Sequence, residues 1–177
     1  WIALVDRLLR GERVTHEGRH FRVEDYQLKP AGTYRARPTI YVGGESEPAR
    51  ALVAAHGDVW FINGQPLAAV ADLIADVARR PAAQGRLRYG LSAFVIARET
   101  EAEAQDEFAR LLSLSRRDEA IRADTRARTD AASVMFAKTD AAAAHHVGTN
   151  GGTAAGLVGS YDGVAERIRA FHAAGIK

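Results

Sequence analysis

The stretch TIYVGGES, residues 39–46, decides the fold of this chain. Its first half, 39–42, is apolar and β-branched without polar alternation, which is typical of a strand buried on both faces of a parallel sheet. Two glycines follow, and Ser46 then stands where a helix N-cap is expected, with Pro48 in the first helical turn. The stretch therefore predicts a parallel strand, a tight turn and a helix.

The same strand-helix unit recurs further along the chain. Residues 58–62 predict a second buried strand, and apolar residues at helical spacing over 67–77 predict its helix. Residues 88–96 predict a third strand, and Thr100 with Glu103 forms a capping box that begins another helix. Strand-helix units in series with short loops predict a parallel α/β sheet.

The flanking segments are less regular. Residues 2–9 predict a short helix, and 14–16 with 19–23 predict a hairpin. The apolar pattern weakens over 115–152, which we interpret as a mobile helical insertion, a lid over the strand ends. A last helix is expected from Asp162, after a glycine-rich stretch.

Three parallel strands do not close a barrel or complete an ordinary open sheet. An edge and apolar faces would stay uncovered. We therefore expect the chain to be a piece of a larger domain, truncated at both ends.

Composition excludes several classes of function. The chain has 177 residues, 47% hydrophobic and 26% charged, with a formal charge of +2. The basic residues are scattered among acids without a stripe, which argues against nucleic-acid binding. No apolar run reaches the length of a membrane span. There is no cysteine, so disulfides and thiolate sites within this segment are excluded, and a cytoplasmic location is the default expectation.

An ordered set of motifs resembles one enzyme family, the luciferase-like flavin monooxygenases, and within it the alkanesulfonate and dimethyl sulfone monooxygenases. The motifs are Leu8–Gly11, Glu17–Phe21, Pro38–Ser46, Val95–Thr100 and Gly156–Gly159. The resemblance implies that residues 1–177 are the C-terminal portion of a single (β/α)8 TIM barrel. The three strands would be the fifth to seventh, and the eighth would begin at Ile176.

The resemblance also implies the chemistry. A separate NAD(P)H:FMN reductase would supply reduced FMN, and O2 would provide the oxygen atom inserted into a small organosulfur substrate, a sulfone or sulfonate, with C–S cleavage. We expect a homo-oligomer. A deazaflavin (F420)-dependent oxidoreductase of the same fold remains open, as does a non-catalytic flavin-binding or oligomerisation fragment. The sequence identifies no catalytic residue.

Two segments are predicted to hold the flavin. By resemblance the Glu-Ser pair belongs to the flavin phosphate site, and glycines before a helix N-terminus suit an approaching phosphate. A plain N-cap is the alternative. A mobile loop that carries an arginine in the sulfonate enzyme corresponds here to residues near Asn150, although a simple linker is also compatible. The predicted cofactor-binding residues are Gly43, Gly44, Glu45, Ser46, Asn150 and Gly151.

Three residues are predicted to line the substrate pocket: Asn63, Ser92 and Phe94. In the sulfonate enzyme the corresponding places hold tryptophan, arginine and histidine. Without that charge-paired donor, an uncharged substrate fits better than a sulfonate anion. Asn63 is alternatively a turn residue, and Phe94 alternatively belongs to the barrel core.

The adjacent pair His145-His146 does not predict a metal site. Neighbouring residues on a helix point about 100° apart, and no carboxylate has i+4 spacing from both. We expect no metal.

Overall fold

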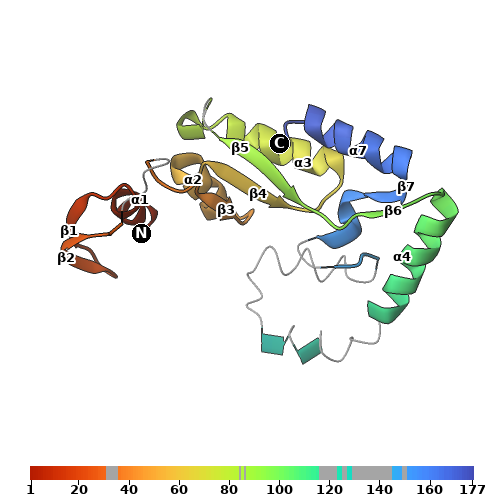
Figure 1. Cartoon of the computed structure of the whole chain (residues 1–177), viewed down its shortest axis with the longest axis horizontal. Helices are drawn as coiled ribbons and strands as arrows, with labels where there is room; N and C mark the ends of the chain where they lie inside the picture. The colour runs from red at the N-terminus through yellow and green to blue at the C-terminus, as the bar shows by residue number, and fades with distance from the viewer. Residues whose placement is uncertain are drawn as a thin grey trace. The chain divides into compact units, whose positions relative to one another are not determined.

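The computed structural model describes residues 1–177 apart from 31–35, 84, 86, 116–122, 125–126, 129–144 and 149–150 (Figure 1). Most of the expected insertion 115–152, and Asn150 with it, lies outside the described residues. The chain divides into two compact units, Trp1–Ile40 and Tyr41–Lys177. The assignment of 1–177 to a single barrel domain stays a prediction.

The first unit holds a short helix and a hairpin. Its elements are α1 (Ile2–Leu9), β1 (Arg13–Glu17) and β2 (Arg22–Gln27). The strands pair antiparallel, as expected. The second strand begins at Arg22, not at residue 19, because the turn is wider than predicted and closes through a hydrogen bond from Gly18 N to Phe21 O of 3.0 Å.

The second unit is built on a parallel sheet in the order β3-β4-β5. Its strands and the helices between them are β3 (Tyr41–Gly43), α2 (Glu47–His56), β4 (Val59–Asn63), α3 (Leu67–Ala78), the 3-10 turn η1 (Pro81–Ala83) and β5 (Arg88–Ser92). The predicted alternation of strand and helix is confirmed. The first strand starts at Tyr41, two residues later than expected.

A second pair of parallel strands continues the unit. Its elements are β6 (Ile96–Arg98), α4 (Glu101–Ser115), the 3-10 helix η3 (Gly152–Ala155), β7 (Val158–Ser160) and α7 (Tyr161–Ala173). The prediction of one strand over 88–96 is wrong. The backbone leaves β4 after Ser92, Phe94 N bonds to Gly152 O at 3.0 Å, and Ile96 then pairs with Val158.

Local capping residues set where the helices begin, as the sequence predicts. Ser46 Oγ accepts from Ala49 N at the start of α2. Thr100 and Glu103 bond reciprocally, with Glu103 Oε2 accepting from Thr100 N at 3.0 Å and Thr100 Oγ1 accepting from Glu103 N at 3.2 Å. Ser160 caps α7, so that helix begins one residue before the expected Asp162.

Side chains alternate across the sheet, and one face is covered by helices. Val42, Trp60 and Ile62 are buried, and Trp60 and Ile62 have no exposed surface. The buried residues of the neighbouring helices include Val53, Ala54, Val70, Val77, Val164 and Phe171. Figure 1 shows α3 and α7 along the same side of β4 and β5. This side is the hydrophobic core of the unit.

The opposite face of the sheet, which we call the bare face, lacks that cover in the part of the chain that the structure describes. Tyr41 is 63% exposed and Phe61 44% exposed. Phe61 is in register with Gly43 and Gly90, and a Cβ at Gly90 would stand 2.9 Å from the Phe61 ring. Parallel sheets are normally covered on both faces, so large apolar side chains on an uncovered face indicate that a covering layer is missing from the described chain.

The chain end meets the sheet beyond β5. Ile176 forms a parallel bridge with Tyr89, and Lys177 N donates to Tyr89 O at 2.9 Å. This placement agrees with the expectation that a further strand begins at Ile176. The described strands form no closed barrel.

Candidate functional site

The carboxyl ends of the parallel strands carry the predicted site residues. Gly43 ends β3, Asn63 ends β4 and Ser92 ends β5. Asn63 and Ser92 are paired in the β4-β5 ladder, so they lie side by side. This is the edge of a parallel α/β sheet where ligands are usually bound.

The turn after β3 has room for a ligand close to its backbone. Gly44 has φ +103°, a conformation that L side chains rarely adopt. A Cβ at Gly43 would meet no atom nearer than Phe61 O at 4.0 Å, so that side of the turn is open. Trp60 Nε1 donates to Gly44 O at 2.9 Å and fixes the turn to the neighbouring strand. A phosphate group fits beside such a turn at the N-terminus of a helix.

Ser46 lies at the N-cap of α2, as predicted, and its hydroxyl accepts from Ala49 N at 3.4 Å. A cap and a phosphate contact are compatible at one hydroxyl, since its oxygen accepts from Ala49 N and its proton remains a donor. The cofactor role of Ser46 stays a prediction.

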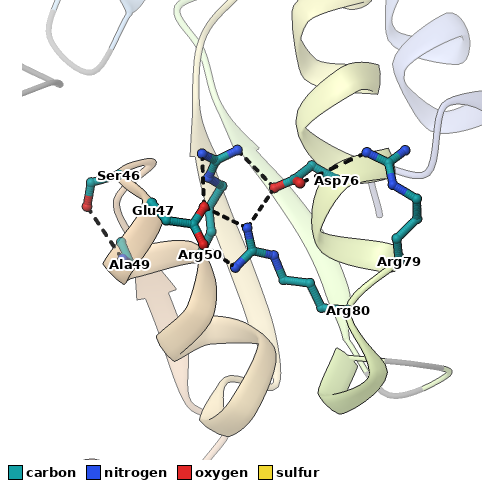
Figure 2. Close-up of polar contacts among 7 residues, drawn as sticks. All are labelled: Ser46, Glu47, Ala49, Arg50, Asp76, Arg79 and Arg80. Atoms are coloured by element: carbon teal, nitrogen blue, oxygen red, sulfur yellow. Dashed lines mark hydrogen bonds and ion pairs between the residues drawn. The ribbon is translucent and has the colours of Figure 1, made fainter.

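Charged side chains brace the first turn of α2 against the end of α3 (Figure 2). Arg80 donates to both oxygens of Glu47, at 2.9 and 2.8 Å, and also to Asp76 at 3.0 Å. Arg50 donates to Asp76 at 2.9 Å. The hydrogen bonds from Arg80 hold the pKa of Glu47 below its usual value. Desolvation acts to raise the pKa of Asp76, but its hydrogen bond and charge pairing with Arg80 leave it lowered.

A glycine contact brings the loop of Gly151 onto the strand ends. A Cβ at Gly151 would stand 2.0 Å from Gly64 O, and a Cβ at Gly64 would stand 2.9 Å from Ser92 O and 3.1 Å from Gly152 O. Only glycine fits at this approach. The structure thus places Gly151, predicted from sequence, beside the Asn63–Ser92 pair.

Phe94 lies just beyond this contact. It is 47% exposed in the described part of the chain, and its place in the substrate pocket or in the barrel core stays a prediction. A Cβ at Gly148 would stand 2.6 Å from the ring of Phe94, so the ring packs against that glycine. Thr153 joins the same loop, with Thr153 N donating to Val147 O at 2.9 Å and Val147 N to Thr153 Oγ1 at 3.0 Å.

Two contributors at the strand ends were not predicted. They are Gly64 and Gln65, which directly follow β4. Gln65 Nε2 donates to Glu45 Oε1 at 2.8 Å. A glycine that follows a strand is the available signal for Gly64, but its contact partner lies far along the chain.

A hollow of ≈ 370 Å³ lies on the bare face, away from these strand ends. It is lined by Tyr41, Val59, Phe61, Arg88, Tyr89, Gly90, Leu91, Ile176 and Lys177. Tyr41, Val59 and Arg88 are the first residues of their strands, and neither Asn63 nor Ser92 lines the hollow. Burial raises the pKa of Tyr89. We place the candidate site at the carboxyl ends, where the polar residues and glycines converge.

Neither a metal centre nor a membrane span is found in the described part of the chain. No group of three or more His, Asp or Glu residues there is arranged to hold a metal ion. Burial, together with the neighbouring His145, lowers the pKa of His146. None of the described helices combines the length and the apolar character that crossing a bilayer requires.

Comparison with known proteins gives a family match over residues 1–177, to the luciferase-like monooxygenases. A riboflavin lyase, solved with modified FMN and riboflavin, has a TM-score of 0.72 and 18% identity over 98% of this chain. EDTA monooxygenase from Chelativorans sp. BNC1 has a TM-score of 0.59 and 19% identity over 92%. The coenzyme F420-dependent tetrahydromethanopterin reductase from Methanopyrus kandleri has a TM-score of 0.59 and 14% identity over 97%.

The chain spans about half the length of these structures, covering 49%, 45% and 52% of them respectively. At such low identity the likeness concerns the fold. The α/β arrangement described above matches that of luciferase-like TIM-barrel enzymes.

Proposed function

The chain belongs to the luciferase-like monooxygenase family, and we propose that it is the C-terminal portion of a (β/α)8 barrel that oxygenates a small organosulfur compound. Reduced FMN would come from a separate NAD(P)H:FMN reductase. The observation that supports this most is the convergence of Asn63, Ser92 and Gly151 at the carboxyl ends of the parallel strands. In a TIM barrel this end is the active-site end.

The flavin phosphate would be held at the turn of Gly43–Ser46. Backbone N–H groups at the start of α2 and the partial positive charge of the helix end favour an anion there. Gly43 leaves room for it. The pairing of Glu47 with Arg80 offsets a negative charge in the first turn of the same helix. When bound, the flavin supplies the activation of O2, which the side chains themselves cannot provide.

The substrate would lie between Asn63, Ser92 and Phe94. Asn63 and Ser92 offer neutral donors and acceptors, and the half-exposed ring of Phe94 offers an apolar surface. Neutral groups suit an uncharged sulfone better than a sulfonate anion, whose burial calls for a charged partner. The chain's own part in the reaction is to orient the substrate and to exclude water.

The test compares substrates in the complete gene product, with FMN, NADH and a flavin reductase. We expect O2 consumption that depends on dimethyl sulfone and exceeds that with a short alkanesulfonate. Changing Ser92→Arg together with Phe94→His restores a cationic pair. Because a charge-assisted bond contributes about 1.5–3 kcal/mol, relative kcat/KM should move toward the sulfonate by roughly one to two powers of ten. A wild-type preference for the sulfonate would refute the substrate assignment alone.

Hydride transfer with a deazaflavin is the second candidate, because the F420-dependent reductase has the same TM-score as EDTA monooxygenase. It requires no O2. Turnover with reduced F420 under anaerobic conditions, without O2 uptake in the FMN assay, would favour it. Flavin binding without turnover in either assay would favour a non-catalytic protein. The expected homo-oligomer and the cytoplasmic location stay predictions.

A further inference from the structure

The side chain of Glu45 points to the neighbouring strand end. Glu45 is only 7% exposed, and its Oε1 accepts from Asn63 N at 3.2 Å and from Gln65 Nε2 at 2.8 Å. Gln65 Nε2 is also 3.4 Å from Asn63 O. A single carboxylate from the turn after β3 therefore accepts from the last residue of β4 and from Gln65, two residues further on. We call Glu45, Asn63 and Gln65 the carboxylate bracket.

The carboxylate bracket continues the sheet where the backbone ladder stops. β3 pairs with β4 only as far as Gly43 and Phe61. Asn63 lies two residues beyond Phe61, and the Glu45 carboxylate serves as its acceptor on that side. A buried carboxylate needs such donors, because an unpaired charge there is costly. Glu45 and Gln65 together thus set the backbone position of Asn63 and, through it, of Gly64.

The consequence reaches the substrate pocket. Asn63 is paired with Ser92, and Gly64 carries the close approach of Gly151. A shift of the end of β4 would move both the Asn63–Ser92 pair and the contact between Gly64 and Gly151. A substrate-positioning error of about 1 Å is enough to cost much of an enzyme's rate.

We propose that Glu45 is a positioning residue: its carboxylate fixes the backbone of Asn63 and Gly64, and so the place of Asn63 in the substrate pocket. Any flavin contact at Glu45 is then made by its main chain. This inference rests on the proposed function, because it assigns the bracket to the pocket of that reaction. It differs from a cofactor role of the carboxylate, which the resemblance by itself would have suggested.

A reciprocal exchange tests the bracket in the complete gene product. Gln65→Glu sets two carboxylates against each other and should force the strand end apart. The double variant Glu45→Gln with Gln65→Glu again pairs one amide with one carboxylate, with the amide now at position 45 and the carboxylate at position 65. We expect Gln65→Glu to raise the KM for the sulfur substrate by about tenfold and the exchange to return it to within about threefold of wild type. Flavin Kd should stay within about threefold in both variants.

Amide hydrogen exchange at Asn63 gives a readout that is independent of turnover. It should quicken by about tenfold in Gln65→Glu and slow again in the exchange variant. Glu103→Gln is the control. In the described part of the chain, the exposed Glu103 carboxylate accepts its hydrogen bonds from Thr100, within the capping box of α4. It should leave KM and the Asn63 exchange unchanged.

Two outcomes would overturn the proposal: an exchange variant no better than Gln65→Glu, or a flavin Kd that changes more than KM. Loss of the proposed function is recognised separately. If wild type does not oxygenate organosulfur compounds, the amide exchange still decides whether Glu45 holds the strand end.

Discussion

The contact between Gly151 and Gly64 can be tested with a matched pair of glycine substitutions. Gly151 has φ +86° and Gly156 φ +72°, so alanine is strained at both, at about 1–2 kcal/mol. The two sites differ in their surroundings. A Cβ at Gly156 would meet nothing within 4 Å, whereas one at Gly151 would stand 2.0 Å from Gly64 O. An ordinary carbon–oxygen contact is far longer, so the backbone at Gly151 must move.

We therefore expect different costs for the same substitution. Gly156→Ala should lower the free energy of unfolding by about 1–2 kcal/mol, the backbone strain alone. Gly151→Ala carries that strain and an overpacking cost of about 1–3 kcal/mol as well. The measurement is urea denaturation of the complete gene product, followed by tryptophan fluorescence. Equal losses, within about 0.5 kcal/mol, would refute the close approach and the placement of this loop on the strand ends.

Three further predictions concern stability. Trp60→Phe leaves Gly44 O without its hydrogen bond and loosens the core, so it should lower the free energy of unfolding by about 2–4 kcal/mol in urea denaturation. The control Trp1→Phe, at a site that is 69% exposed, should lower it by under about 1 kcal/mol. Arg80→Met should lower Tm at pH 7, because Arg80 pairs with Glu47 and Asp76 in their ionised forms and depresses the pKa of both carboxyl groups. The difference in Tm between wild type and variant should shrink as the pH falls below 4.5 and then 3.8, the usual pKa values of these two groups. A difference of the same size at pH 3 would contradict this. Residues 1–177 expressed alone should be loosely packed or aggregated, because Tyr41 and Phe61 on the bare face stay exposed; a sharp thermal transition with dispersed amide signals would count against this.

Local signals in the sequence were sufficient for most of the elements. Ser46 and the Thr100–Glu103 capping box act within one helical turn, so they could be recognised without knowing the fold. The apolar strand before Gly43 was recognisable because it lacks polar alternation. Its expected burial on both faces is not observed, since Tyr41 is 63% exposed on the bare face of the described chain. Together these predicted the parallel α/β class and the order of the elements from β3 to β5, but not the separate strands β6 and β7.

Features that depend on distant partners could not be predicted. The break after Ser92 exists because Phe94 bonds to Gly152 and Ile96 to Leu157, which belong to a later segment. β7 was missed for the same reason, since Val158–Ser160 is too short to show a pattern and is defined by its pairing with Ile96–Arg98. The direction of the Glu45 side chain was likewise hidden, because a carboxylate before a helix has the same sequence signature whether it contacts a ligand or a strand.

The row formed by Gly43, Phe61 and Gly90 on the bare face constrains how this sheet can change during evolution. The Phe61 ring occupies the volume that a side chain at Gly90 would need, at 2.9 Å from its Cβ, while Gly43 leaves open space on the other side. A larger residue at position 90 therefore requires a smaller residue at 61 or a displaced Phe61 ring. Among homologues, positions 61 and 90 should covary in size, and position 43 should vary independently of both.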